Sequence, residues 1–486
     1  MQHSRLQPLF LIKVSLAALV LALLAGCAVG PAYQRPVATE GEALQLQQWA
    51  GTASTAPGDL LERGPWWLLF NDAELTRLIE QVAASNLTVA QAAAAVRQAE
   101  AQVSEQRAGF FPLISLDGRA NRADSGSSGG SSNASAFSSR SRVNTSTQLN
   151  LAASWAPDLW GRLSAGADGV QASAAASVAD LAAARLAAQG ALAANYWSVR
   201  AADAQANLLQ TSIDGFRRSL GIVQNRYAAG IVAKTDVLQA QTQLANAQAE
   251  YDGLLSQRAR FSNAAAVLIG KAPADFAIAP NPAWQASVPD IPASIASTLL
   301  QRRPDIAAAE SRLAAANAQI GIAQSAYYPS IGLSASAGVG GNRLADLFSL
   351  SSSVWALGLS AAQTLFDAGA TTARVQGTRA GYDLAIARYR QTVLTAFQEV
   401  ENLLQDSRAL QSQSLLRQQS AEAASLVEQQ ITNRYRSGLV GFSEVIAAQN
   451  SALAARRTQL QTTASQQASA GALIQALGGG WQVGVP

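Results

Sequence analysis

One short stretch that occurs twice constrains the fold of this chain more than any other feature. It covers residues 226–241 and again residues 434–449, and each copy begins with Arg-Tyr-x-x-Gly. Gly230 and Gly438 suit the left-handed residue that ends a helix. Segments rich in Ala, Gln and Leu flank both copies. Each copy is therefore predicted to be a sharp turn between two long antiparallel helices in an internally duplicated chain.

The segments beside the turns are predicted to be unusually long helices. Residues 163–227 contain no proline, and at the usual rise per residue they would form a helix of roughly 95 Å. The matching helix, 370–436, would reach roughly 100 Å. Thr235 and Ser443 suit the N-cap of the helices that follow the turns. The helices that return after the turns are expected at 235–268 and 443–477, and a single first helix is expected at 73–110.

Four segments change from a helical period to an alternation of apolar and polar residues. They are residues 113–122, 145–155, 331–337 and 355–360. Alternation over about 10 residues is typical of transmembrane barrel strands, although a soluble hairpin shows the same pattern. The sequence therefore predicts one β-hairpin in each repeat.

The duplication also suggests how the chain is divided. Residues 304–327 match 87–110, and prolines cluster between 273 and 304, which marks a junction between two halves. The expected segments are a signal peptide (1–26), a lipidated tether (27–65), a first repeat (66–280, with its hairpin at 112–158), a junction (281–303), a second repeat (304–480, with its hairpin at 329–365) and a tail (481–486).

The N-terminal segment has the pattern of a cleaved leader. Arg5 and Lys13 precede the apolar run Val14–Ala25. The run ends in Leu-Ala-Gly before Cys27, which resembles a bacterial lipobox. The resemblance implies that Cys27 is acylated and becomes the mature N-terminus. It also implies sorting to the outer membrane, since residue 28 is Ala and not the Asp that marks inner-membrane retention. An ordinary secretory signal with a stray Cys is the alternative.

Rare residue types exclude most kinds of active site. The only Met, His and Cys of the chain are Met1, His3 and Cys27. After removal of the leader, no His–Cys metal site, Ser-His-Asp triad or disulfide can be built. Carboxylate-only catalysis stays formally open, but we expect no enzyme, no metal and no cofactor beyond a covalent lipid on Cys27. The net charge of +3 gives no basic field for nucleic acid.

Assembly follows from the number of strands. Four strands with lipid-facing side chains cannot close a barrel, and open sheet edges are excluded from the hydrocarbon layer. Closure therefore requires several subunits around a ring, and three chains would supply an even number of strands. The expected fold is mainly α, with a long antiparallel α-helical barrel joined to a transmembrane β-barrel.

Several longer motifs occur in a fixed order. They are Trp66-Trp67-Leu-Leu-Phe, Trp160-Gly161-Arg162, Arg302-Arg303-Pro304-Asp305-Ile306 and Ala315-Ala-Asn-Ala-Gln-Ile320. Together with the two turns they cover about residues 60–480, and the chain resembles the outer-membrane efflux lipoproteins of the TolC superfamily, in their NodT/OprM-like branch. The resemblance implies a homotrimeric duct through outer membrane and periplasm, docked to a periplasmic adaptor (membrane fusion protein) and an inner-membrane RND-type pump.

Such ducts export drugs or other small molecules by passive conduction, and that is the function we expect. A duct of a protein-secretion system is the alternative within the same fold. A coiled-coil surface fibre is disfavoured, because it predicts neither strands nor an internal duplication.

The resemblance also implies a gate at the periplasmic end, where the two turns meet. Thr235 and Asp236 match the gate residues of the first turn, and Tyr435 matches the tyrosine of the second. Glu444 falls where the superfamily often places an acid that faces the bore. A second acid commonly follows three positions later, but this chain has Ala447 there, so cation binding should be weaker.

The same turns, marked by Gly230 and Gly438, are implied to contact the adaptor. Each gate residue also has a plainer interpretation. An acid early in a helix complements the helix dipole without any role in a gate, and a tyrosine such as Tyr435 or Tyr227 can simply pack.

Overall fold

The computed structural model describes residues 29–36, 65–125, 142–289, 303–342 and 353–479. These residues divide into two compact units. Unit 1 contains the described parts of 1–36, 97–175 and 311–387, and unit 2 those of 37–96, 176–310 and 388–486. Cys27, the expected leader, most of the tether, most of the junction and the tail lie outside the described residues.

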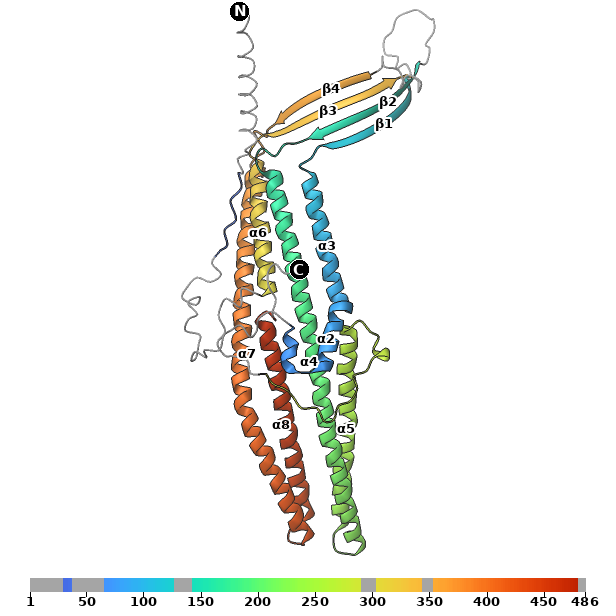
Figure 1. The fold of residues 1–486 in the computed structure, drawn as a ribbon, viewed down its shortest axis with the longest axis vertical. Coiled ribbons are helices and arrows are strands. Elements are labelled where there is room, and N and C mark those ends of the chain that lie inside the picture. The colour runs from blue at the N-terminus through green and yellow to red at the C-terminus, as the bar shows by residue number, and fades with distance from the viewer. Residues whose placement is uncertain (1–28, 37–64, 126–141, 290–302, 343–352, 480–486) are drawn as a thin grey trace, which may run out of the picture. The chain divides into compact units, whose positions relative to one another are not determined.

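The two β-hairpins of unit 1 join into one antiparallel sheet (Figure 1). Its strands lie in chain order: β1 (Leu113–Ser125), β2 (Arg142–Trp155), β3 (Ser330–Gly341) and β4 (Ser353–Ala362). β2 comes from the first repeat and β3 from the second, and their pairing places Trp155 opposite Leu333. Backbone hydrogen bonds therefore join the two repeats, and the predicted four strands per chain are confirmed.

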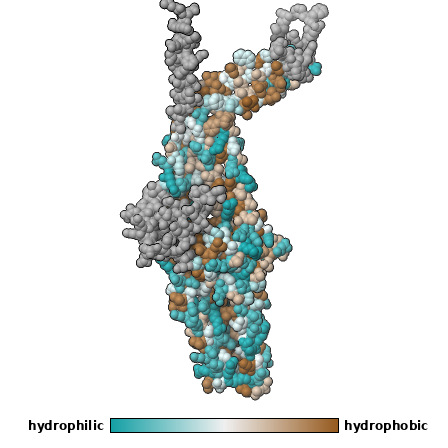
Figure 2. All heavy atoms as spheres, in the orientation of Figure 1, coloured by the Kyte–Doolittle hydropathy of each residue, from teal (hydrophilic) through white to brown (hydrophobic). Residues whose placement is uncertain are grey.

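The strand register places the predicted apolar residues on one face of this sheet. Two rows run across β1, β2, β3 and β4 in turn: Leu116, Leu151, Ala337 and Trp355, and then Ile114, Ala153, Ala335 and Leu357. Ser115 and Asp117 fall on the other face, because side chains alternate along a strand. Trp355 and Leu357 are 77% and 76% exposed. Figure 2 shows apolar side chains gathered over the sheet, and an apolar face of this kind marks a contact with lipid or protein.

Two aspartates start the longest helices. Asp158 accepts hydrogen bonds from the backbone N–H groups of Leu163 (2.9 Å) and Ser164 (2.7 Å) at the start of α4 (Arg162–Ala228). Asp367 accepts one from Thr371 N–H (2.7 Å) at the start of α7 (Ala370–Arg436). The Thr371 hydroxyl, and then the backbone N–H groups, lower the pKa of the Asp367 carboxyl. These three bonds satisfy backbone donors that a helix start leaves unpaired.

The prediction of a single helix over 73–110 is wrong, because the chain breaks at Asn86. It forms α2 (Ala73–Ser85) and α3 (Leu87–Ala108) instead. The Asn86 side chain accepts a hydrogen bond from Val89 N–H (3.0 Å) and donates one to the carbonyl of Leu268 (2.7 Å), and Ser85 donates to that of Ile269 (2.7 Å). These bonds tie the break to the end of α5 (Lys234–Leu268) and favour two helices over one.

The main core of unit 2 combines aliphatic and aromatic side chains, and an ionic cluster lies beside it. Phe70 packs on Trp197, with ring centroids 4.7 Å apart. In the ionic cluster, the Arg200 side chain is only 3% exposed and forms ion pairs with Asp203 (3.1 Å) and Glu74 (3.1 Å). Tyr196 donates a hydrogen bond to Asp72 (2.7 Å), and burial, together with that bond, raises the pKa of its hydroxyl. The cluster links α2 to α4.

The remaining elements complete both repeats. They are α6 (Pro304–Ser325), α8 (Phe442–Ala476) and the short 3-10 helices η4 (Trp66–Phe70) and η5 (Pro273–Asp275). The helices α4, α5, α7 and α8 match their predicted bounds within one residue at each end. Among the described residues, no helix combines the length and the apolar character needed to cross a membrane.

Candidate functional site

The two repeated turns have the same backbone geometry. Gly230 and Gly438 have φ values of +74° and +76°. Ile231 N–H donates to the carbonyl of Arg226 (2.9 Å), and Leu439 N–H donates to that of Arg434 (2.9 Å). This six-to-one bond after a left-handed residue is the Schellman motif, which satisfies free carbonyls at a helix end. The prediction of a left-handed glycine in each turn is confirmed.

The prediction that Thr235 and Ser443 cap the following helices is wrong. Each helix begins before these residues, with Ala233 and Gly441 at the N-cap, and neither cap is completed by a side chain. The backbone carbonyls of Ala233 and Gly441 instead accept from the N–H groups of Asp236 (3.1 Å) and Glu444 (3.2 Å). Thr235 and Ser443 therefore occupy the second helical position, and the two acids occupy the third.

A small apolar cluster joins the two turns to each other. It contains Val223, Val237, Ala240, Tyr435, Phe442 and Val445. These residues come from α4, α5, α7 and α8, so the α4/α5 hairpin contacts the α7/α8 hairpin here. Tyr435 is 6% exposed, and its ring lies 5.5 Å from that of Phe442 between centroids. Tyr435 thus belongs to the seam between the two hairpins.

The structure brings the predicted gate residues to the turns but does not bond them together. Thr235 and Glu444 are exposed, and Asp236 is half-buried. The Tyr435 hydroxyl is buried and has no hydrogen-bond partner among the described residues. Within this chain, Tyr435 therefore makes no side-chain hydrogen bond to Thr235 or Asp236.

Sequence reasoning missed Arg226 as a contact residue. Its guanidinium carbon lies 4.8 Å from the centroid of the Tyr435 ring, and its Nη1 donates to the Tyr435 carbonyl (3.2 Å). The signal available in the sequence was its recurrence as Arg434 in the second copy. That signal was ambiguous, because a residue that recurs in both turns can serve the turn rather than a contact between turns.

Farther along the same helices, a polar seam joins the two hairpins. Gln243 donates to Gln449 (3.4 Å) and to Asn450 (3.3 Å), and Gln449 donates to Ser219 (3.3 Å). These bonds run between α4 or α5 on one side and α8 on the other. They are long for hydrogen bonds between neutral groups, so each contributes little alone.

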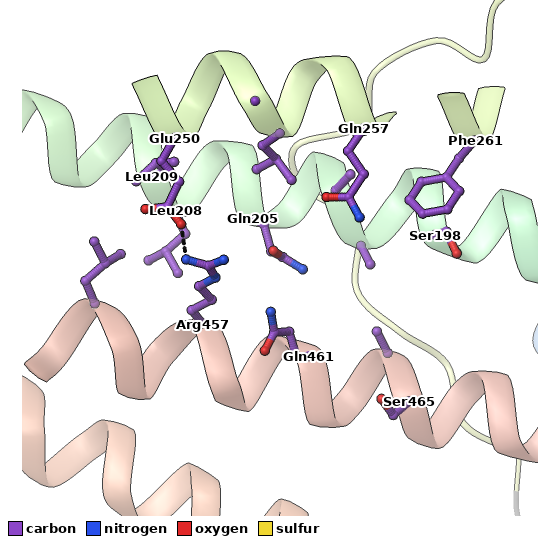
Figure 3. A pocket seen from close by; sticks show the side chains of 16 residues that line it. Ser198, Gln205, Leu208, Leu209, Glu250, Gln257, Phe261, Arg457, Gln461 and Ser465 are labelled. Atoms are coloured by element: carbon purple, nitrogen blue, oxygen red, sulfur yellow. Dashed lines mark hydrogen bonds and ion pairs between the residues drawn. The ribbon is translucent and has the colours of Figure 1, made fainter. Parts of the chain in front are cut away.

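A cavity of about 790 Å³ continues this seam between α4, α5 and α8 (Figure 3). Arg457 points across it from α8 and forms an ion pair with Glu250 of α5. Each of the three helices also contributes an amide side chain to the lining, namely Gln205, Gln257 and Gln461, and apolar residues such as Leu208 and Phe261 line other parts of the cavity. The polar seam and the ion pair join the two helical hairpins through contacts that are individually weak, so these polar contacts can break when the hairpins separate.

The comparisons with known proteins agree with one another. The chain matches the family described as outer membrane efflux protein over residues 78–271 and 295–479. It is 30% identical to outer membrane protein OprJ of Pseudomonas aeruginosa, over 96% of each chain. It is also 30% identical to the probable efflux pump outer membrane protein TtgC of Pseudomonas putida, over 94% of each chain.

Solved structures show the same relationship. The outer-membrane channel OprN aligns with a TM-score of 0.82 at 28% identity and covers 94% of this chain and 100% of its own. The open state of the MtrE outer membrane channel of Neisseria gonorrhoeae aligns with a TM-score of 0.80 at 26% identity and covers 93% and 98%.

Proposed function

The chain belongs to the outer membrane efflux protein family and is an outer-membrane efflux channel, and we propose that three copies form one duct, gated where their repeated turns meet. The observation that carries the trimer is the sheet. β1 and β4 each pair with only one strand among the described residues, and the apolar face of the sheet is exposed. A membrane-embedded sheet must close, and three copies supply an even number of strands for a closed barrel.

The partners we propose are a periplasmic adaptor and an inner-membrane RND-type pump. The turns offer the contact surface, because the residues that follow Gly230 and Gly438 are apolar and exposed: Ile231 is 64% and Leu439 is 70% exposed. Small exposed apolar groups at a rigid turn are suited to packing against another protein. The left-handed glycines fix where these groups point.

The cargo we propose is small molecules, without a narrow preference built into this chain. Relatives at similar identity are described as serving different compounds: pyoverdine for OpmQ of Pseudomonas putida, antibiotics for ArpC and toluene for a TtgC protein. Relatives that are about equally similar to this chain are thus named for different compounds, which supports a passive conduit with selection made by the pump.

The gate we propose consists of Thr235, Asp236, Tyr435 and Glu444. Tyr435 contributes its buried ring to the contact between hairpins. Asp236 and Glu444 occupy the same position in their helices, so three copies would place two sets of acids near one axis. Like charges brought together repel, which favours a ring that binds or attracts cations. Thr235 lies beside Asp236 and is open to solvent.

We also propose that Cys27 carries a covalent lipid. The residues just after it support the idea, because they lie against unit 1: Asn317 of α6 donates to the Pro31 carbonyl (2.9 Å). Gly30 approaches Gly321 so closely that a Cβ on Gly30 would lie 2.8 Å from the Gly321 Cα. Cys27→Ser should abolish labelling with radioactive fatty acid in cells. Normal labelling of that variant would exclude Cys27 as the acceptor.

The proposed duct is tested by the mass and conductance of the purified protein. The detergent-solubilised protein should have the mass of three chains and should form ion-conducting channels in planar bilayers. A monodisperse monomer that retains β-structure would overturn the proposal, because a four-stranded open sheet cannot form a pore.

A further inference from the structure

Arg226 makes a contact between the two turns that the gate described above does not include. We propose that Arg226 locks the α4/α5 hairpin to the α7/α8 hairpin, by stacking on the Tyr435 ring and binding the C-terminal end of α7. The proposal rests on the proposed duct and adds a positioning residue to its gate.

The geometry gives Arg226 two separate holds on Tyr435. The guanidinium carbon lies 4.8 Å from the ring centroid, within the range of a cation–π contact. The Nη1 group donates to the main-chain carbonyl of Tyr435 at 3.2 Å. Arg226 is half-buried and Tyr435 is buried, so solvent screens these contacts only in part. Arg226 of the first hairpin therefore contacts both the ring and the backbone carbonyl of Tyr435 in the second hairpin.

The hydrogen bond from Arg226 to the Tyr435 carbonyl is favoured because that carbonyl lies at the C-terminal end of α7. The Tyr435 carbonyl belongs to the last turn of that helix and already accepts from Gly438 N–H (2.9 Å). Carbonyls in a last turn have free lone pairs and carry the negative end of the helix dipole. The Arg226 guanidinium donates a hydrogen bond to this carbonyl, and its positive charge interacts favourably with the negative end of the helix dipole. Separation of the hairpins would leave this helix end without that partner.

The duplication shows that the contact is specific and is not a by-product of the turn. Arg434 and Tyr227 are the repeat equivalents of Arg226 and Tyr435. Tyr227 is 45% exposed, and Arg434 is exposed. Within the described part of the chain, the guanidinium of Arg434 makes no hydrogen bond, ion pair or cation–π contact, whereas Arg226 makes two contacts. Two turns with the same backbone thus use their arginines differently, and Arg434 is a matched control.

The Tyr435 hydroxyl takes no part in this lock. It is buried and has no partner among the described residues. The ring and the carbonyl carry the contact, so removing the hydroxyl should leave the lock intact, while removing the ring should weaken it.

The test is single-channel conductance of purified protein in planar bilayers, with trimer yield and thermal midpoint measured in parallel. Arg226→Met should raise the fraction of time in the high-conductance state by roughly tenfold, because a charged hydrogen bond and a cation–π contact are lost together. Arg226→Lys keeps a cation and a donor and should restore most of the closure. Tyr435→Leu should open the channel more than Tyr435→Phe, because the phenylalanine keeps both the ring and the carbonyl that Arg226 contacts. Arg434→Met, the matched control, should behave as the parent.

Three results would overturn the lock. In the first, Arg226→Met conducts like the parent. In the second, Arg226→Met and Arg434→Met open the channel equally, which would make the effect one of net charge. In the third, Arg226→Met lowers only the thermal midpoint, which would make Arg226 merely structural. If the proposed duct itself were wrong, the result would be distinguishable, because neither the parent nor any variant would then conduct ions in the bilayer.

Discussion

At the scale of single residues, the left-handed backbone of the turns is the clearest demand on the sequence. Gly438 has φ +76°, and nothing lies within 4 Å of where its Cβ would be, so the backbone alone disfavours a side chain. We expect Gly438→Ala to destabilise the turn by about 1–2 kcal/mol and to lower the thermal midpoint of the detergent-solubilised protein. Gly377→Ala is the control, because Gly377 lies inside α7 with no positive φ and no atom within 4 Å of where its Cβ would be. Equal effects of the two substitutions would contradict this account.

Glu444 is expected to affect the ion selectivity of the channel and not its stability. It is exposed in the first turn of α8, and three copies in a trimer would place three carboxylates around one axis. Glu444→Gln should reduce the preference of the channel for cations over anions, because it removes that ring of charge. Ala447→Asp should strengthen block by divalent cations, since it adds a second ring. The measurement is reversal potential in a salt gradient, and an unchanged potential in Glu444→Gln would place Glu444 outside the bore.

The contacts of individual residues in the turns could be predicted from the sequence only in part. Gly230 and Gly438 could be predicted because only glycine is at ease in a left-handed turn. The assignment of Thr235 and Ser443 to the N-cap is wrong, because each helix begins two residues earlier, after Ala233 and Gly441, and no capping side chain marks that start in the sequence. The difference between Arg226 and Arg434 could not be predicted, because it depends on which hairpin presents a helix end to the other.

At the scale of elements, long helices without proline were predictable to within a residue, whereas the break at Asn86 was not. The reason is physical. Helix propensity and period are local properties of the sequence, but the Asn86 break depends on bonds to the end of α5, far away in the chain. Both polar and apolar contacts join α4 and α5 to α8, and they differ in how much each contributes to stability.

Magnitudes favour the apolar contacts. The Glu250–Arg457 pair is 41% and 46% exposed, and pairs of this kind are worth about 0.2–1 kcal/mol. Phe216 of α4 is 5% exposed and packs with Ala247 of α5, and Leu453 of α8, from the other hairpin, packs against the same cluster. Substitution of Phe216 by Ala should cost about 3–5 kcal/mol. We expect Phe216→Ala to lower the thermal midpoint far more than Arg457→Gln. A larger effect of Arg457→Gln would show that the ion pair, and not the apolar cluster, holds this part of the seam.

At the scale of the whole molecule, duplication and alternation carried most of the information. The duplication predicts two hairpins with matching roles, and the alternation predicts which side chains share a face. What the sequence could not supply was the order of the strands, because pairing between β2 and β3 joins residues from different repeats. Once that pairing is known, the apolar rows become continuous across the sheet and define one surface.

That surface leads to the last prediction, which concerns how the protein reaches its membrane. Leu357 lies on the apolar face of β4 and is 76% exposed, while Ala356, its neighbour, faces the other way. In a closed barrel Leu357 would meet lipid and Ala356 would meet water in the bore. An arginine on the lipid side costs about 2–4 kcal/mol near the bilayer midplane, and the cost is repeated in each of three copies. Leu357→Arg should therefore sharply reduce the trimer recovered from outer membranes. Ala356→Arg carries the same charge and size, and it should assemble normally while altering conductance. The reverse outcome would mean that the faces of the sheet are assigned the wrong way round.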